Sequence, residues 1–139
     1  MLGNNTLNIL LVEDDQDDVE LMQDALRDKG VLFQMDVIKQ GDKVLPFLKS
    51  CKSFPNIILL DLNLPKMHGR EVLSRIKLSD DFRHIPIAIL TTSSSQSEKE
   101  FCLSAGASYF LTKPSTVDGF NKTIELIKKI ALHDQRFAE

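Results

Sequence analysis

Apolar and polar positions alternate along the chain in two periods, one typical of strands and one typical of helices. Runs such as 9–12 and 57–60 are continuously apolar, as expected of central strands covered on both faces. Elsewhere apolar residues recur three or four positions apart, as in Val19, Met22 and Leu26, which is the spacing of one helix face. The predicted strands are 9–12, 33–38, 57–60, 86–90 and 109–111, and the predicted helices are 16–29, 44–48, 71–78, 97–105 and 116–133.

Five strand–helix units in regular alternation predict the fold class. Right-handed crossovers leave few arrangements other than an open parallel sheet with helices on both faces. We therefore expect an α/β protein with a flavodoxin-like (βα)₅ doubly wound parallel sheet and the strand order 2-1-3-4-5. A chain of 139 residues fits one domain, so we expect a single domain over 1–139, with its core at about 8–133 and no separate output domain.

The composition excludes several classes of partner. With 42% hydrophobic residues and a formal charge of −3, the chain can bury an ordinary core but lacks the basicity that attracts nucleic acid. No apolar run approaches the roughly 20 residues that span a membrane, and the start lacks the pattern of a signal peptide. Cys51 and Cys102 have no partners at metal-ligand spacing, so we expect reduced thiols in a cytoplasmic protein.

Polar residues stand where the apolar runs stop. Glu13 and Asp14 follow the first predicted strand, and Asp61 follows the third. Thr91 and Lys113 follow the fourth and the fifth. The carboxyl ends of parallel strands open onto one edge of the sheet, so these side chains are expected to converge. Because clustered carboxylates repel one another, the set implies a cation, and hard oxygen ligands favour Mg²⁺.

The same residues can support phosphoryl chemistry. A carboxylate can attack phosphorus and form an aspartyl phosphate, and positioning and charge neutralisation dominate the catalysis of that step. Asp61 suits the role of nucleophile. Lys113 would bring a positive charge to one phosphoryl oxygen, and the Thr91 hydroxyl would donate a hydrogen bond to another.

Four short motifs at these strand ends resemble the receiver domain of two-component response regulators. They are Val-Glu-Asp-Asp at 12–15, Leu-Asp-Leu-Asn-Leu-Pro at 60–65, Leu-Thr-Thr-Ser at 90–93 and Thr-Lys-Pro at 112–114. Each motif alone is weakly specific, but their order at the ends of strands one, three, four and five is strong evidence. The resemblance covers nearly the whole chain.

The resemblance implies how the site works. Asp61 would be the phosphoacceptor, supplied by a sensor histidine kinase or a phosphotransfer protein. Asp14 and Asp61 would bind Mg²⁺ together with the backbone carbonyl of Asn63, while Glu13 would act through water. A receiver is not an enzyme with a separate substrate, because it promotes only its own phosphorylation and dephosphorylation.

The resemblance also implies a conformational switch. Thr91 and Lys113 would sense the phosphoryl group, and Phe110 matches the switch aromatic of the family. The readout surface would then be the fourth helix, the fifth strand and the fifth helix. Ser93 occupies a position that tunes dephosphorylation, and the peptide bond before Pro114 is expected to be cis, as it often is in receivers.

Two longer segments look like the small regulators partnered with phytochrome-type histidine kinases. These segments are 61–73 and 85–93, whereas 107–110 departs from the asparagine-containing form of those regulators. A phytochrome-type kinase is accordingly one expected partner. Such regulators often form homodimers, and Leu126 and Ile130 either widen the buried face of the last helix or form an apolar patch for self-association.

The acidic residues that open the first helix have a simpler interpretation. Asp15, Asp17 and Asp18 crowd the start of the predicted helix, where a carboxylate can cap backbone N–H groups and interact favourably with the helix dipole. We expect them to serve the helix, with no role toward a ligand.

Three alternative functions differ from the receiver in the residues that they require. A haloacid-dehalogenase-like phosphatase would need a second aspartate at Asn63 as a general acid. A flavodoxin-like mononucleotide binder would need a hydroxyl- and glycine-rich loop after the first strand, but the acidic stretch 13–18 repels phosphate and disfavours flavin. An interaction module that is never phosphorylated stays open.

Overall fold

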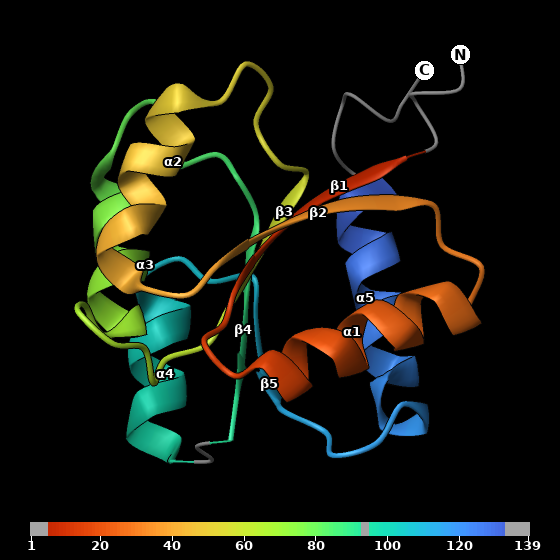
Figure 1. The fold of residues 1–139 in the computed structure, drawn as a ribbon. Coiled ribbons are helices and arrows are strands. Elements are labelled where there is room, and N and C mark those ends of the chain that lie inside the picture. Colours follow the sequence, from red (N-terminus) through yellow and green to blue (C-terminus); the bar gives the residue numbers. More distant parts are fainter. Residues whose placement is uncertain (1–5, 93–94, 133–139) are drawn as a thin grey trace.

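The computed structural model describes residues 6–92 and 95–132 and contains one five-stranded sheet. All strand pairs are parallel, and the strand order is β2-β1-β3-β4-β5, which confirms the predicted flavodoxin-like topology (Figure 1). The strands are β1 Leu7–Val12, β2 Phe33–Ile38, β3 Ile57–Leu60, β4 Ile87–Thr91 and β5 Tyr109–Thr112.

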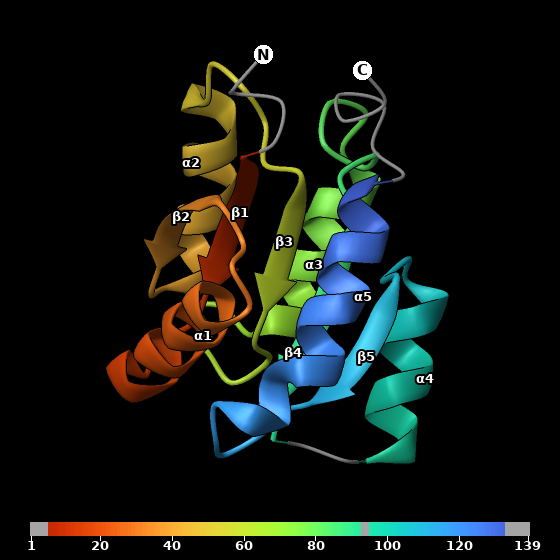
Figure 2. The same cartoon turned by 90° about the vertical axis from the view of Figure 1, so that its right-hand side faces the viewer.

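Helices cover both faces of the sheet. Figures 1 and 2 show α1 and α5 on one face and α2, α3 and α4 on the other, as expected of a doubly wound fold. The helices are α1 Gln16–Asp28, α2 Val44–Ser50, α3 Gly69–Leu78, α4 Gln96–Ser104 and α5 Asn121–Leu132. No helix in the described part of the chain has the length and hydropathy needed to cross a membrane.

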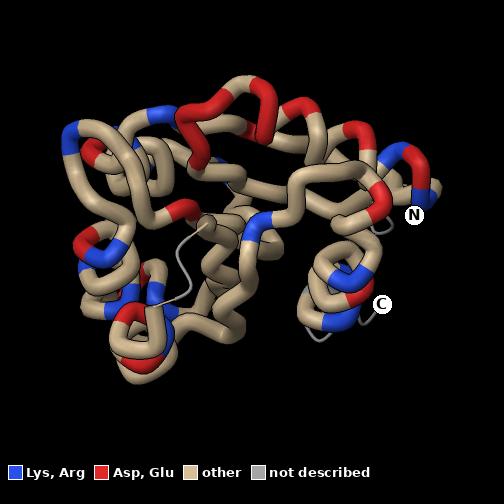
Figure 3. Tube along the Cα trace, turned by 90° about the horizontal axis from the view of Figure 1, so that it is seen from below, with Lys and Arg blue, Asp and Glu red and all other residues tan. Residues whose placement is uncertain are grey.

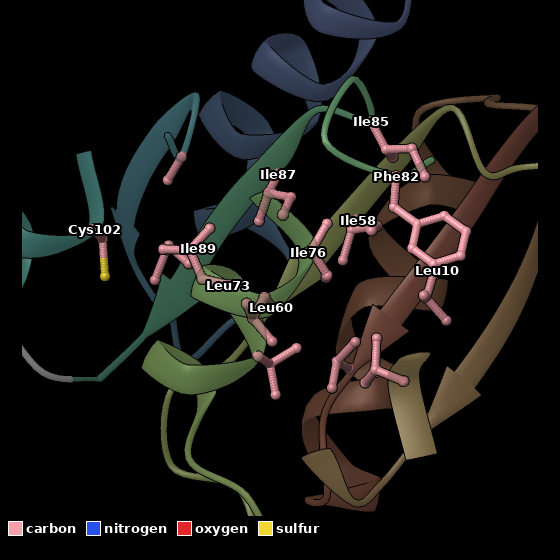
Figure 4. Close-up of a cluster of buried hydrophobic side chains, with 14 of the residues drawn as sticks. Leu10, Ile58, Leu60, Leu73, Ile76, Phe82, Ile85, Ile87, Ile89 and Cys102 are labelled. Carbon is pink, nitrogen blue, oxygen red and sulfur yellow. The ribbon is translucent and has the colours of Figure 1, made fainter. Parts of the chain in front are cut away.

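Side chains of the central strands point alternately into two cores. Leu10, Ile58 and Ile87 point toward α2, α3 and α4 and pack there with Leu73 and other apolar residues (Figure 4). The residues between them on each strand point toward α1 and α5. Every side chain of β3 and β4 is buried, so the expected coverage on both faces is confirmed. The edge strand β2 is less buried, as its alternating pattern predicted.

The largest difference from the predicted elements lies before α5. That helix was expected from residue 116 but begins at Asn121, after a short 3₁₀ turn over Asp118–Phe120. The hydroxyl of Thr116 accepts a hydrogen bond from the backbone N–H of Gly119 at 3.1 Å, which stabilises the tighter turn. The predicted helix end at 133 lies outside the described residues, as does the predicted tuning residue Ser93.

The predicted cis peptide bond before Pro114 is wrong. None of the described residues has a cis peptide bond, so the Lys113–Pro114 bond is trans. For a bond preceding proline, trans is the lower-energy form by about 0.5–1 kcal/mol, and cis persists only where the surrounding structure imposes it.

Candidate functional site

The carboxyl end of the sheet brings the predicted polar residues together. Glu13 and Asp61 directly follow β1 and β3, and the backbone N–H of Asp61 donates to the Val12 carbonyl at 3.0 Å. Thr91 is the last residue of β4, and its carbonyl accepts from the backbone N–H of Lys113 at 2.8 Å. Figure 3 looks onto this end of the molecule, where acidic stretches of the trace (red) face a basic position (blue).

The ammonium group of Lys113 lies among three carboxylates. Its Nζ is 2.7 Å from Glu13 Oε1, 2.9 Å from Asp18 Oδ2 and 3.2 Å from Asp61 Oδ2. The Lys113 side chain is only 7% exposed, so these pairs are shielded from water. Because an ammonium has three N–H donors, these carboxylates can satisfy all of them.

An acidic trio of Glu13, Asp14 and Asp61 forms a candidate site for a divalent cation. One oxygen from each carboxylate lies within 4.8 Å of the other two. Glu13 and Asp61 are buried, whereas Asp14 is exposed. Carboxylate oxygens are hard ligands, and a cation would neutralise charge that is costly to bury. The donor set therefore fits Mg²⁺ or a similar ion.

The buried charges shift one another's proton affinities. Burial raises the pKa of Glu13 to about 7, although hydrogen bonds from Lys113 and from the Asp15 backbone N–H oppose the shift. Burial alone would lower the pKa of Lys113, but its hydrogen bonds to Glu13 and Asp18 outweigh that effect and raise the pKa. Lys113 is therefore a cation at neutral pH.

The loop after β3 is held close to Asp61. The backbone N–H of Asn63 donates to Asp61 Oδ1 at 3.4 Å, which leaves Oδ2 facing Lys113. The N–H of Gly69 donates to the Leu62 carbonyl at 2.8 Å. A Cβ at Gly69 would collide with the backbone oxygen of Asp61, so only glycine allows α3 to start this close to the site.

The two predicted switch residues lie on neighbouring strands. The Thr91 side chain is fully buried at the end of β4. Phe110 of β5 is opposite Ile89 of β4 and packs, half-buried, against the core beneath α2, α3 and α4. Their roles in switching stay predictions.

Asp18 is the site residue that the sequence analysis missed. It was assigned to the start of a helix alone, yet its carboxylate contacts Lys113. Asp15 does cap α1, accepting a hydrogen bond from the Asp17 N–H at 2.9 Å, and Asp17 is exposed. No signal in the sequence distinguishes Asp18 from its acidic neighbours, because its contact is with a residue 95 positions away.

A family profile described as the response regulator receiver domain matches residues 9–125. The chain belongs to this family. This receiver is therefore a signalling domain of the two-component type. The likeness agrees with the geometry, because the acidic trio and Lys113 meet at the strand ends where the motifs placed them.

The chain is similar to several known response regulators and regulatory proteins. This receiver is 36% identical over 125 residues to the probable methanogenesis regulatory protein FilR2 of Methanothrix harundinacea, covering 87% of this chain and 81% of that protein. The structure of the phosphorylated cyanobacterial phytochrome response regulator RcpA matches with a TM-score of 0.82 at 30% identity, covering 92% of this chain and 95% of RcpA.

The response regulator Rcp1 of Synechocystis sp. is a third similar protein. The structure of its Mn²⁺-bound form matches with a TM-score of 0.79 at 33% identity, covering 92% of this chain and 96% of Rcp1. The predicted resemblance to phytochrome-associated regulators is thus confirmed by RcpA.

Proposed function

We propose that this receiver accepts a phosphoryl group on Asp61 from a histidine kinase or phosphotransfer protein in a Mg²⁺-dependent reaction. The observation that carries the proposal is the environment of the Asp61 carboxylate. Asp61 is buried and belongs to the acidic trio, and its Oδ2 lies 3.2 Å from Lys113 Nζ. The likeness to RcpA supports a phytochrome-type kinase as the phosphoryl donor.

The chemical step is a transfer to a carboxylate oxygen of Asp61. That oxygen forms a bond to phosphorus while the phosphorus–nitrogen bond of a phosphohistidine breaks, and its electron pair stays on the imidazole nitrogen. Lys113 donates to one phosphoryl oxygen, and the Thr91 hydroxyl donates to another. Later attack by water on phosphorus releases the Asp61 carboxylate with the electron pair of the broken bond, so no separate substrate is turned over.

The metal would be held by Asp14 and Asp61 together with the backbone carbonyl of Asn63, while Glu13 would act through water. A divalent cation in this position would neutralise the carboxylates and the phosphoryl oxygens during transfer. The exposed position of Asp14 leaves the acidic trio open to solvent on that side, as a site that exchanges its cation requires.

The signal would leave through the surface formed by α4, β5 and α5. Thr91 ends the strand that leads to α4, and Phe110 lies on the next strand, so the movement of one side chain can reach the other through neighbouring backbone. Ile130 packs against the core beneath α1 and α5, which favours a widened buried face over an apolar patch for self-association. We therefore expect output through a protein partner, with homodimerisation as a measurable alternative.

Intact mass spectrometry with acetyl phosphate and Mg²⁺ tests this function. The wild-type protein should gain one phosphoryl adduct that disappears when Mg²⁺ is chelated. Asp61→Asn should gain none, and Asp36→Asn should behave as wild type, because Asp36 is an exposed carboxylate on the edge strand β2. Light scattering on the same samples reports any dimer.

Two results would contradict the proposal. An adduct that persists in Asp61→Asn would place the phosphoacceptor elsewhere. If the wild-type protein gains no adduct under any of these conditions, the interaction module that is never phosphorylated becomes the better interpretation.

A further inference from the structure

The contact between Asp18 and Lys113 joins the first helix to the end of the last strand. The two residues are 95 positions apart in the sequence, and Asp18 Oδ2 lies 2.9 Å from Lys113 Nζ. The other two carboxylates at this ammonium, those of Glu13 and Asp61, belong to the acidic trio. Asp18 contacts the lysine without being part of that trio.

We propose that Asp18 is a positioning residue that keeps Lys113 at the site when the cation and the phosphoryl group are bound. This inference rests on the proposed function and assigns a role to a residue outside the predicted acceptor, metal and switch sets. Asp18 acts through Lys113, which it contacts directly.

Charge explains why such a residue is needed. When Glu13 and Asp61 share their charge with a divalent cation, they attract Lys113 less strongly, and the ammonium then faces a second positive charge. Among the described residues, the remaining carboxylate in contact with Lys113 is that of Asp18. It can hold the ammonium within reach of a phosphoryl oxygen at the moment when the other partners are occupied.

The helix that carries Asp18 is firmly anchored. Asp15 caps its first turn, and Val19, the residue after Asp18, is buried together with Met22 and Leu26. Asp18 also lies in the first turn, where the helix dipole stabilises a negative charge. Its carboxylate is therefore held in place by the helix, as a positioning group requires.

A purely structural ion pair is the competing interpretation. In that case Asp18 only ties α1 to the end of β5, and its loss would lower stability without affecting how the site binds a phosphoryl group. The two interpretations differ in whether the effect of Asp18 on binding depends on the presence of Lys113.

A binding cycle with beryllofluoride, a stable mimic of the phosphoryl group, separates them. Asp18→Asn is compared with Asp17→Asn, which removes the same charge from the same turn at an exposed side chain with no contact to Lys113. In Mg²⁺-saturated protein, Asp18→Asn should weaken beryllofluoride binding about tenfold relative to Asp17→Asn. In a Lys113→Ala background, the two variants should bind it equally well. Asp18→Glu should recover part of the lost affinity.

Each other outcome has a distinct meaning. Equal affinity of Asp18→Asn and Asp17→Asn, with Lys113 present, overturns the positioning role alone. A tenfold loss that remains in the Lys113→Ala background also overturns it, because the effect would not pass through the lysine. If the wild-type protein binds no beryllofluoride, the proposed function fails, and the inference fails with it.

Discussion

The two helices that flank the carboxyl end of the sheet, α1 and α4, are attached to it in different ways. Helix α1 buries Val19, Met22, Ala25 and Leu26 against the sheet and α5. Within α4, all of which the structure describes, only Cys102 is buried. The helix that brings a fixed charge to Lys113 is thus attached by more buried apolar residues than the helix on the proposed output surface, and we expect α4 to shift at lower cost than α1.

Polar contacts add to the packing of Phe101 and Cys102 of α4 against the core. Arg70 of α3 lies 3.3 Å from Glu98 of α4, and its guanidinium stacks over the Phe101 ring with its carbon 4.1 Å from the ring centroid. Arg70 follows Gly69, which abuts the backbone of Asp61. These contacts connect the start of α3, next to Asp61, to α4. Partly exposed pairs of this kind contribute little to stability.

The largest expected effect compares apolar truncations in the two helices. Leu26→Ala in α1 should lower the free energy of unfolding by about 2–5 kcal/mol, because it opens a cavity at a fully buried position. Leu103→Ala in α4, at a side chain that is 41% exposed, should change it by less than about 0.5 kcal/mol. Urea denaturation measures both free energies, and equal losses would show that α4 is attached as firmly as α1.

The next largest effect is the pH dependence of stability that Glu13 causes on the α1 side of the site. Its pKa is raised from 4.5 to about 7 in the folded protein, so the folded state holds a proton that the unfolded state releases between these values. This contribution to stability is complete below the unfolded pKa and is lost as the pH rises through 7. In the presence of a chelator, the free energy of unfolding of the wild-type protein should fall by on the order of 1–3 kcal/mol relative to that of Glu13→Gln as the pH rises over this range.

The control for this pH dependence of stability is Glu20→Gln, which changes an exposed glutamate of α1 outside the site. It should follow the wild-type pH dependence. If Glu13→Gln follows it as well, the carboxyl of Glu13 does not titrate in the window that its burial implies.

A smaller effect is expected from the polar attachment of α4. Arg70→Ala should lower stability by about 0.5–1 kcal/mol and should speed amide hydrogen exchange in α4 while leaving α1 unchanged. Arg75→Ala removes an arginine of the same helix whose ion pair to Glu71 stays within α3. That variant should leave exchange in α4 unchanged, and equal acceleration by both variants would show that Arg70 has no special link to α4.

The smallest expected effect concerns the rate at which the two cysteine thiols react. Cys102 is the fully buried residue of α4, and burial raises its pKa to about 11, so it should react slowly with a thiol reagent in the native state. Cys51 is half-buried and should react first. Arg70 lowers the pKa of Cys102, so losing its charge should by itself slow the reaction of the thiol. In a Cys51→Ser background, Arg70→Ala should nevertheless speed the reaction of Cys102, and a slower rate would count against restraint of α4 by Arg70.

The sequence predicted the fold and most of the site because both follow from the strand pattern. Once the continuous apolar runs define parallel strands, topology brings Glu13, Asp61 and Lys113 to one edge wherever the helices lie in detail. The contact of Asp18 depends on the orientation of α1 and on a residue far away in the chain. The start of α5 depended likewise on one local hydrogen bond, that of the Thr116 hydroxyl, which periodicity does not reveal.

Hydrogen exchange with and without Mg²⁺ and beryllofluoride reports on the site and on the proposed output surface in one experiment. We expect changed exchange in α4 and β5 of the wild-type protein, little change in the buried face of α1, and no response in Asp61→Asn. The same response in Asp61→Asn, or a wild-type response that leaves α4 and β5 unaltered, would contradict signalling from Asp61 to the α4–β5–α5 surface.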